Sequence, residues 1–488
     1  MASLLDLPDE LILAVIRYCY WHFDDSRYHL ATVCRRLSFP ARVVLAEHAG
    51  VHVGTFDEAN SPEDLIAFTK WLKKYPRLVN CLKWTQLGWE DKCRYKTFKD
   101  ALTIVAKSSS MTRFSVSIAS NTHFWILKML CNPAPEQFEN LRQLDLDTQD
   151  SSPLPANAVA RLCKMPKLES IAIDHTPILE SLPLVPVDLQ PLYGPPTKPL
   201  ALKTLSCRST LTHLDLLRTI LPHAPRLFDL EMSVPGPGIR VQDKTTPMPS
   251  HVDMVPREDQ PFRPNDIQVA LKHVQASLQS LSITTMTMGE LNYDTIFVHP
   301  SEHDNSVLDL SSFKKLQDLR ISSCLLFGRH KSAAVEHYEE DRKIWQLIPS
   351  QIQDLHITFE GLQGIFTGLD EIYMRQLLEN SSYGGEFLPW WIVHVAGAIL
   401  DPDKLGWLRD LFEQFEQNKF PSLKEVVLQE CWSPSWGYWK MIDVKSILKL
   451  RVPNSIRLSV KIMVPEDMAD ECLASLRTLG FQGDFEDR

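Results

Sequence analysis

Histidine pairs come closest to a chemical site in this sequence. His48 and His52 are four residues apart, and so are His299 and His303, a spacing at which two imidazoles on one helix can bind a metal ion. Neither pair has a third His or Cys close to it in the sequence. We therefore interpret all four as solvated or hydrogen-bonded side chains and expect neither a metal ion nor a cofactor.

The motifs of common catalytic sites are absent from the sequence. There is no Gly-rich phosphate loop followed by Lys, no Gly-x-Ser-x-Gly and no His-Glu-x-x-His. Acidic residues are numerous, but no spacing singles out a general acid–base pair. The sequence thus predicts a protein that is not an enzyme by itself. An enzyme of unrecognised α/β type remains an alternative, which a deep pocket with converging titratable groups would favour.

Tryptophan gives the strongest signal for binding. Three of these residues, Trp432, Trp436 and Trp439, follow directly on a predicted strand, and Trp84 and Trp89 occupy the matching place early in the chain. Tryptophan offers a large contact area with few rotatable bonds, which suits a protein-binding hot spot. The alternative is that these rings fill gaps between irregular repeats or cap the end of the array.

Composition narrows the class of protein. The 488 residues are 44% hydrophobic and 23% charged, and 51 basic against 61 acidic residues give a net charge of −10. These values indicate a folded chain and argue against a broad nucleic-acid-binding surface. No apolar run reaches membrane-spanning length, and the acidic start does not resemble a secretory signal. The ten cysteines form no Cys-x-x-Cys pair, so we expect reduced, buried thiols in a cytoplasmic or nuclear protein.

The first fifty residues predict a small helical unit with more apolar surface than it can bury. A helix is expected over residues 11–20, with Leu11, Val15 and Tyr18 on one face and Ile12, Ile16 and Cys19 on the neighbouring face. A second helix is expected over residues 25–37, interrupted or kinked at Pro40. So short a unit implies a protein partner. The alternative is that its surplus surface packs on the rest of the same chain.

Two half-motifs in this region resemble an F-box. They are Leu7-Pro8-Asp9-Glu10-Leu11-Ile12 and Leu30-Ala31-Thr32-Val33-Cys34-Arg35-Arg36. The resemblance covers residues 3–48 and implies three helices that dock on the Skp adaptor of a cullin–RING ubiquitin ligase. It also implies which side chains touch the adaptor: Leu7, Pro8, Leu11, Ile12, Ile16, Leu30, Val33 and Cys34. The sequence departs from the family pattern at Leu37, where a Trp is common, and in the longer stretch 21–27.

Beyond residue 60 a helical stretch is repeatedly followed by a short strand of the pattern Leu-x-x-Leu-x-Leu. Alternating apolar residues point to one side of such a strand. Examples begin at Leu141, Leu168, Leu202, Leu227, Leu278, Leu316, Ile352 and Leu423. In the earliest example the register beginning at Val79, with Leu82 and Trp84, fits better than the one beginning at Leu78.

This phrase resembles the leucine-rich repeat. The predicted fold class is α/β, with F-box helices followed by an irregular leucine-rich-repeat-like solenoid over residues 60–480 that carries a parallel sheet on its concave face. An ordinary parallel α/β domain is the alternative. Pro-rich insertions at 183–199 and 235–264 are expected as extended loops, either passive or used for docking. Residues 360–400 fit no repeat.

Together the two resemblances imply the substrate-recognition subunit of a cullin–RING ubiquitin ligase. Such a receptor bridges the Skp adaptor, and through it cullin, to a protein target whose identity the sequence does not give. Its contribution would be orientation and local concentration rather than a catalytic side chain. A leucine-rich-repeat scaffold without any ligase is the alternative.

Overall fold

The computed structural model describes much of the chain, and every statement below concerns its described residues. These are residues 7–22, 35–47, 51–52, 62–89, 95–118, 129–131, 137–147, 154–174, 178–179, 199–211, 214–235, 239–241, 264–286, 295–297, 306–327, 343–360, 406–431, 439–443, 451–465 and 485–486. The chain divides into two compact units, Met1–Arg208 (unit 1) and Ser209–Arg488 (unit 2). The domain boundary predicted between residues 48 and 60 lies inside unit 1.

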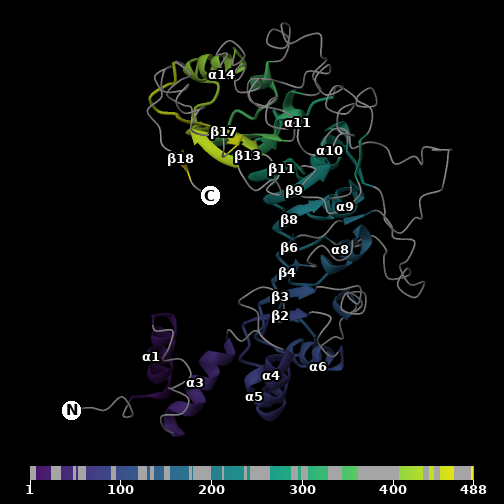
Figure 1. The fold of residues 1–488 in the computed structure, drawn as a ribbon, viewed down its shortest axis with the longest axis vertical. Coiled ribbons are helices and arrows are strands. Elements are labelled where there is room, and N and C mark those ends of the chain that lie inside the picture. Colours follow the sequence, from purple (N-terminus) through teal and green to yellow (C-terminus); the bar gives the residue numbers. More distant parts are fainter. Residues whose placement is uncertain are drawn as a thin grey trace, which may run out of the picture. The chain divides into compact units, whose positions relative to one another are not determined.

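Unit 1 begins with helices and continues as parallel strands taken in chain order (Figure 1). Its helices are α1 (Asp9–His22), α3 (Arg35–Glu47), α4 (Pro62–Lys74), α5 (Pro76–Val79), α6 (Tyr95–Val105) and α8 (Ala156–Leu162). Its main strands are β1 (Val51–His52), β2 (Trp84–Trp89), β3 (Arg113–Ile118), β4 (Gln143–Asp147), β6 (Ser170–Asp174) and β8 (Thr204–Leu211). Each pairs in parallel with the next. A separate parallel pair joins β5 (Leu154–Pro155) to β7 (Ile178–Leu179).

Unit 2 repeats the parallel arrangement and ends in antiparallel strands. The parallel order is β9 (Asp229–Pro235), β11 (Ser280–Met286), β13 (Asp318–Ser322), β14 (Asp354–Glu360), β15 (Glu425–Cys431) and β17 (Arg457–Pro465). Antiparallel pairs join β16 (Trp439–Asp443) to β17 and to β18 (Phe485–Glu486), and β10 (Ile239–Val241) to β12 (Thr295–Phe297). Its helices are α9 (Leu214–Ile220), α10 (Pro264–Leu271), α11 (Ser323–Phe327) and α14 (Gly406–Glu416), with 3₁₀ turns η4 (Leu221–His223), η5 (Lys272–Val274) and η8 (Ile344–Gln346). The predicted α/β class with a parallel sheet is thereby confirmed.

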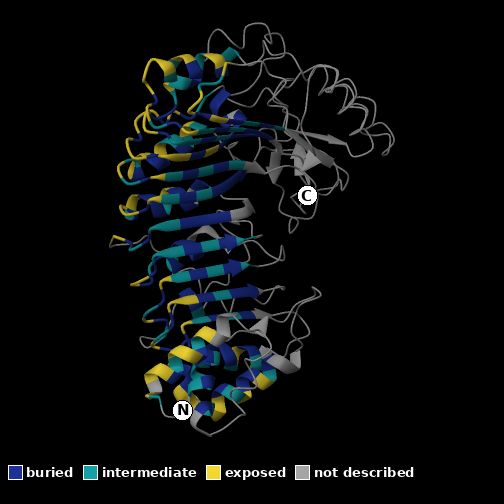
Figure 2. Ribbon diagram, turned by 90° about the vertical axis from the view of Figure 1, so that its left-hand side faces the viewer, coloured by how far each residue is buried: buried dark blue, intermediate teal, exposed yellow. Residues whose placement is uncertain are grey.

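Alternate strand positions form the core of each unit. In Figure 2 the strands show buried residues alternating with partly exposed ones. The buried positions are those of the Leu-x-x-Leu-x-Leu phrase; Leu141, Leu144 and Leu146 are at most 3% exposed. Fully burying one such side chain contributes on the order of 1.5–3 kcal/mol. The helices cover this apolar side, as α9 and α10 do beside β9 and β11 (Figure 1).

Two local predictions were wrong. In the first strand–helix repeat, Thr85 pairs with Phe114 and Leu87 with Val116, so the phrase begins at Leu82 rather than at Val79. A buried Thr stands where the phrase has Leu, which hides the register. The second error concerns the end of the second helix, predicted at residue 37, because α3 continues through Pro40 to Glu47.

Several strands were missed, and several predictions concern residues outside the described ranges. The longest of the missed strands is β17, whose Leu458 and Val460 are buried although no leucine phrase precedes them. Nearly all of both Pro-rich insertions and of residues 360–400 lies outside the described ranges. Within the described residues, no helix has the length and apolar character needed to cross a membrane.

Candidate interaction surfaces

Helices α1 and α3 of unit 1 share a small core of their own. It comprises Ile12, Ile16, Leu37, Ala41 and Val44, all at most 5% exposed. The α3 residues of this set recur at intervals of four and three, which places them on one helical face. Pro40 cannot donate a backbone hydrogen bond, and Leu37, Ala41 and Val44 on both sides of it are buried in this core.

The neighbouring face of α1 carries apolar side chains in contact with solvent. Leu11, Val15 and Tyr18 are 52%, 37% and 63% exposed. A helix turns 100° per residue, so these three lie within about 60° of one another. We call them the α1 stripe. A soluble protein seldom exposes aligned large apolar side chains without a use for them.

The structure separates the side chains that the F-box resemblance assigns to the adaptor. Pro8 and Leu11 are exposed, and Leu7 packs partly against the α1–α3 core. Ile12 and Ile16 are core residues, because α3 already covers them. A partner can reach these two only if α1 leaves α3. Leu30, Val33 and Cys34 lie outside the described residues. Sequence reasoning placed Val15 and Tyr18 beside Leu11 but did not name them as contacts.

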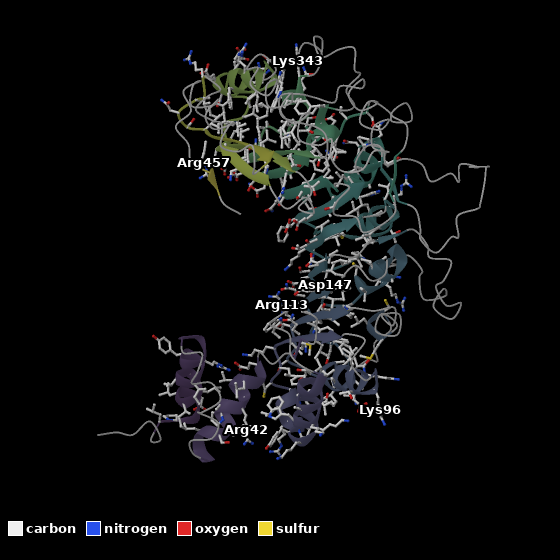
Figure 3. All side chains as sticks on the ribbon, in the orientation of Figure 1. Arg42, Lys96, Arg113, Asp147, Lys343 and Arg457 are labelled. Atoms are coloured by element: carbon white, nitrogen blue, oxygen red, sulfur yellow. The ribbon has the colours of Figure 1, made fainter. Side chains whose placement is uncertain are left out.

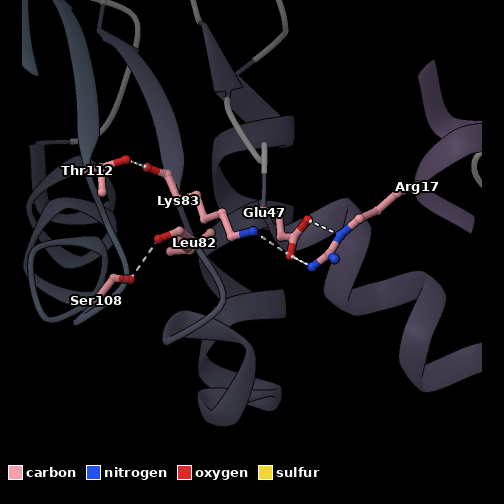
Figure 4. A network of polar contacts seen from close by, with 6 residues as sticks. All are labelled: Arg17, Glu47, Leu82, Lys83, Ser108 and Thr112. Carbon is pink, nitrogen blue, oxygen red and sulfur yellow. Dashed lines mark hydrogen bonds and ion pairs between the residues drawn. The ribbon is translucent and has the colours of Figure 1, made fainter. Parts of the chain in front are cut away.

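An ion-pair network joins α1, the end of α3 and the turn before β2 (Figure 4). Arg17 Nε donates to Glu47 Oε2 at 2.9 Å, and a second guanidinium nitrogen contacts Oε1. Lys83 Nζ lies 3.0 Å from Glu47 Oε1. Burial alone would raise the pKa of Glu47, but hydrogen bonds and attraction from Arg17 and Lys83 outweigh it, and the pKa lies below its usual value. Glu47 is therefore an ionised, nearly buried link between two cations.

Helix α3 also packs on the first helices of the repeat region. The Arg42 guanidinium lies 4.7 Å from the centre of the Tyr75 ring, and Ala46 is fully buried. The alternative prediction was that the helical unit packs on the rest of the same chain. That packing is observed in part, because α3 packs on other helices of unit 1. The α1 stripe nevertheless stays exposed.

Mostly polar residues occupy the other alternate positions of the unit 1 strands. Arg113 lies 5.7 Å from the centre of the Trp84 ring and donates to Asp145 at 2.9 Å. Figure 3 shows Arg113 and Asp147 projecting from the strand side, away from Lys96 on α6. Trp84 therefore lies on this polar face, half-buried beneath a guanidinium. Trp84 is thus not a fully buried core residue.

The remaining tryptophan predictions concern side chains that are not described. Trp89 ends β2 and Trp439 begins β16. Trp432 and Trp436 lie outside the described residues.

Carboxylates form a row along the unit 2 strands. Asp229, Ser280, Asp318, Asp354, Glu425 and Arg457 hold equivalent places on six neighbouring parallel strands. We call these positions, together with the next outward-facing position on each of the six strands, the unit 2 polar face. The second set comprises Glu231, Ser282, Arg320, His356, Val427 and Ser459. A sequence pattern could have predicted this row. The phrases Gln-Asp-Leu-Arg-Ile at 317 and Gln-Asp-Leu-His-Ile at 353 carry aspartate at the same position.

Residue types that ligate metal ions are dispersed within the described residues. No group of three or more His, Cys, Asp or Glu side chains there is placed to hold a metal ion. His52 lies in β1, and His48, His299 and His303 lie outside the described ranges. Cys131, Cys163 and Cys207 are buried and reduced in unit 1.

No protein-family model matches the chain. No curated protein matches it either.

Proposed function

We propose that the chain is the substrate-recognition subunit of a cullin–RING ubiquitin ligase. In this proposal residues 3–48 are an F-box that docks on a Skp-type adaptor, and residues 60–480 are a leucine-rich-repeat-like solenoid that holds a protein target. The chain contributes no catalytic residue to ubiquitin transfer. It would act in the cytoplasm or nucleus.

The observation that carries the proposal is the exposure of the α1 stripe. α1 uses Ile12 and Ile16 to pack on α3 and still presents Leu11, Val15 and Tyr18 to solvent. An apolar stripe on a helix is the form in which one protein offers a helix to an apolar groove or helix face of another. The F-box resemblance of the surrounding residues selects the Skp-type adaptor as the occupant.

The attachment of the helix pair supports the same function. Glu47 joins Arg17 of α1 to Lys83 of the first repeat, and Arg42 stacks on Tyr75. Within unit 1, the adaptor-binding helices are thus held to the first strand–helix repeat by packing and charge. A receptor that orients its target gains from such a fixed attachment, because orientation is its contribution to the reaction.

The leucine-rich-repeat part of the proposal rests on the strand register. Successive phrases align residue by residue, as Leu281, Leu319 and Leu355 do on β11, β13 and β14. Most of their outward-facing positions are polar in both units. Parallel strands repeated in this way present a broad surface suited to binding protein.

Capture of the adaptor by the full-length chain tests the proposal. A purified Skp-type adaptor should bind the wild-type chain, and replacing Leu11, Val15 and Tyr18 together by Gln should weaken binding by about 30-fold or more. Glutamine is neutral and a good helix former, so the helix itself is preserved. Affinity is measured by titration calorimetry.

The matched control is Val269→Gln on α10, because Val269 is also apolar, helical and 57% exposed. This variant should bind the adaptor like the wild-type chain. A wild-type chain that does not bind the adaptor would exclude the ligase role and favour a repeat scaffold without a ligase. Equal binding by the stripe variant would exclude α1 as the contact.

A further inference from the structure

A backbone ladder of hydrogen bonds joins the residues that immediately precede the unit 1 strands, and it begins at the end of α3. The carbonyl oxygens of these residues accept from the amides that start the next strand: Lys83 from Thr112 and Arg113, Thr112 from Arg142 and Gln143, Arg142 from Glu169 and Ser170, and Glu169 from Lys203 and Thr204. Glu47 holds the first such place, because its carbonyl oxygen accepts from the Lys83 amide at 3.0 Å. The ladder therefore includes the helix that packs against α1.

The contact between Glu47 and Lys83 falls in the register of a strand pair. β1 pairs in parallel with β2, and Val51 lies opposite Leu87. Glu47 lies four residues before Val51, and Lys83 lies four residues before Leu87. The offset between β1 and β2 thus continues back to the last residue of α3. The end of α3 stands where an additional strand of the array would begin.

A carboxylate between two cations occurs further along the same ladder. The Glu169 side chain contacts Arg142, one step earlier, at 3.7 Å and Lys203, one step later, at 2.9 Å. One carboxylate therefore connects three consecutive steps of the ladder through side chains as well as through the backbone.

Glu47 connects its neighbours in the same way, with α1 in the place of a preceding strand (Figure 4). Lys83, one step later, lies 3.0 Å from Glu47 Oε1, and Arg17 Nε of α1 donates to Glu47 Oε2 at 2.9 Å. The Glu47 side chain is 6% exposed, against 33% for Glu169, so solvent screens the Glu47 contacts less. Arg17 thus supplies from α1 the cation that a preceding strand supplies to Glu169.

We infer that α3 and β1 form the first unit of the strand array, that α1 caps this unit, and that Glu47 is the positioning residue that fixes the α1 stripe relative to the unit 1 strands. Stacked units of this kind are coupled to their nearest neighbours. The inference deepens the proposed function and rests on it in one respect, since the stripe is taken as the adaptor site. An adaptor bound there would be held at one fixed angle to the strands.

Distances between two spin labels in the full-length chain test this inference. A ketone-bearing non-natural amino acid replaces Ala14 on α1 and Lys107 in the turn after α6, both of which are exposed. Each ketone takes up a hydroxylamine nitroxide, so the cysteines stay unlabelled. Double electron–electron resonance gives the distribution of distances between the labels. The chain that is otherwise wild type should give one narrow peak, because α1 is fixed to the strands.

Glu47→Gln and Arg17→Gln are the decisive variants. Each removes the ion pair between α1 and α3 and should broaden the distance distribution about twofold or more, because α1 then opens locally. Arg17→Lys keeps the positive charge and should broaden it less than Arg17→Gln does. The matched control is Glu169→Gln, which removes the equivalent carboxylate further along the ladder and should leave the distribution unchanged.

Three results would overturn the inference. They are a broad distribution in the otherwise wild-type chain, an unchanged distribution in both decisive variants, and equal broadening by Glu169→Gln, which would show a general loosening of the unit. Thermal melts on the same samples report folding. If Glu47→Gln does not fold, Arg17→Gln decides, because in that variant Glu47 keeps Lys83 as a partner.

Adaptor binding is measured separately by titration calorimetry, so the two proposals can fail independently. A chain that gives the narrow peak and its expected broadening but does not bind the adaptor would contradict only the ligase proposal. A chain that binds the adaptor but gives a broad distribution without any substitution at Glu47 or Arg17 would contradict only the positioning role.

Discussion

Glu47 and Lys83 are joined twice, once through the backbone and once through their side chains. The Lys83 amide donates to the Glu47 carbonyl oxygen at 3.0 Å, and Lys83 Nζ lies 3.0 Å from Glu47 Oε1. The carboxylate also holds Arg17. The end of α3 is therefore connected to α1 and to the turn before β2 at a single residue.

Replacing Glu47 by Gln should destabilise unit 1. The Glu47 side chain is only 6% exposed, so its removal leaves two cations facing a neutral amide in a poorly solvated place. We expect a loss of about 1–2 kcal/mol, because both cations remain partly solvated. Urea unfolding measures the change.

The control for that variant is Asp100→Asn, which breaks the solvent-exposed ion pair with Lys73. Exposed pairs contribute little, so its effect should stay below about 0.5 kcal/mol. A loss of the same size in both variants would contradict a special role for Glu47.

Glu47→Gln and Asp318→Asn should each change the free energy of unfolding in a pH-dependent way. Near neutral pH the first variant should be less stable than the wild-type chain and the second more stable. The pKa of Glu47 is lowered on folding, so its contribution is complete above the unfolded value of 4.5 and is lost as the pH falls through the folded value. Glu47→Gln should thus be destabilising near neutral pH and harmless in acid.

For Asp318 the pKa is raised on folding, so ionisation costs stability as the pH rises from the unfolded value of 3.8 through the folded one. Asp318→Asn should be stabilising near neutral pH, and the advantage should disappear below about pH 4. The groups facing Asp318 are Asp354, Asp229 and Lys424. Urea midpoints between about pH 3 and pH 7 check both signs, and a gain from Asp318→Asn that persists in acid would contradict the repulsion.

Ile12 and Leu11 are neighbours in sequence but should respond differently to truncation. Ile12 is fully buried against α3, whereas Leu11 is 52% exposed. Ile12→Ala should cost about 2–4 kcal/mol through a cavity in the α1–α3 core, and Leu11→Ala should stay within about 0.5 kcal/mol. Hydrogen exchange of α1 and α3, measured by mass spectrometry, should accelerate at least tenfold only in the first variant. Equal acceleration would place Leu11 in a packed site.

The buried thiols of unit 1 should resist modification in the native protein. Burial raises the pKa of Cys131 to about 12 and raises that of Cys163 as well, so neither forms the reactive thiolate near neutral pH. A thiol-specific reagent followed by peptide mass spectrometry should label Cys131, Cys163 and Cys207 only after denaturation. Rapid labelling of the native chain at these positions would contradict their burial.

Local pattern was enough to predict the parallel α/β class and many of the strands. Leu-x-x-Leu-x-Leu places apolar side chains on one side of a strand wherever it occurs, so β4, β6, β9, β11, β13, β14 and β15 follow from spacing alone. In the helix at Pro62–Lys74 the buried residues Leu65, Phe68 and Leu72 recur at intervals of three and four, which is the helical period. Where the pattern weakened, prediction failed, as at Thr85 and in β17.

The sequence by itself determined which residues alternate and where apolar surface is in excess. Only the tertiary structure decided which side of α1 is covered, because Ile12 and Leu11 are both apolar and burial depends on where α3 packs. It also decided that Asp318 and Asp354 face each other, although they lie far apart in the chain. Register between strands is a long-range property, fixed by packing of the buried positions, and the charges on the opposite face follow from it.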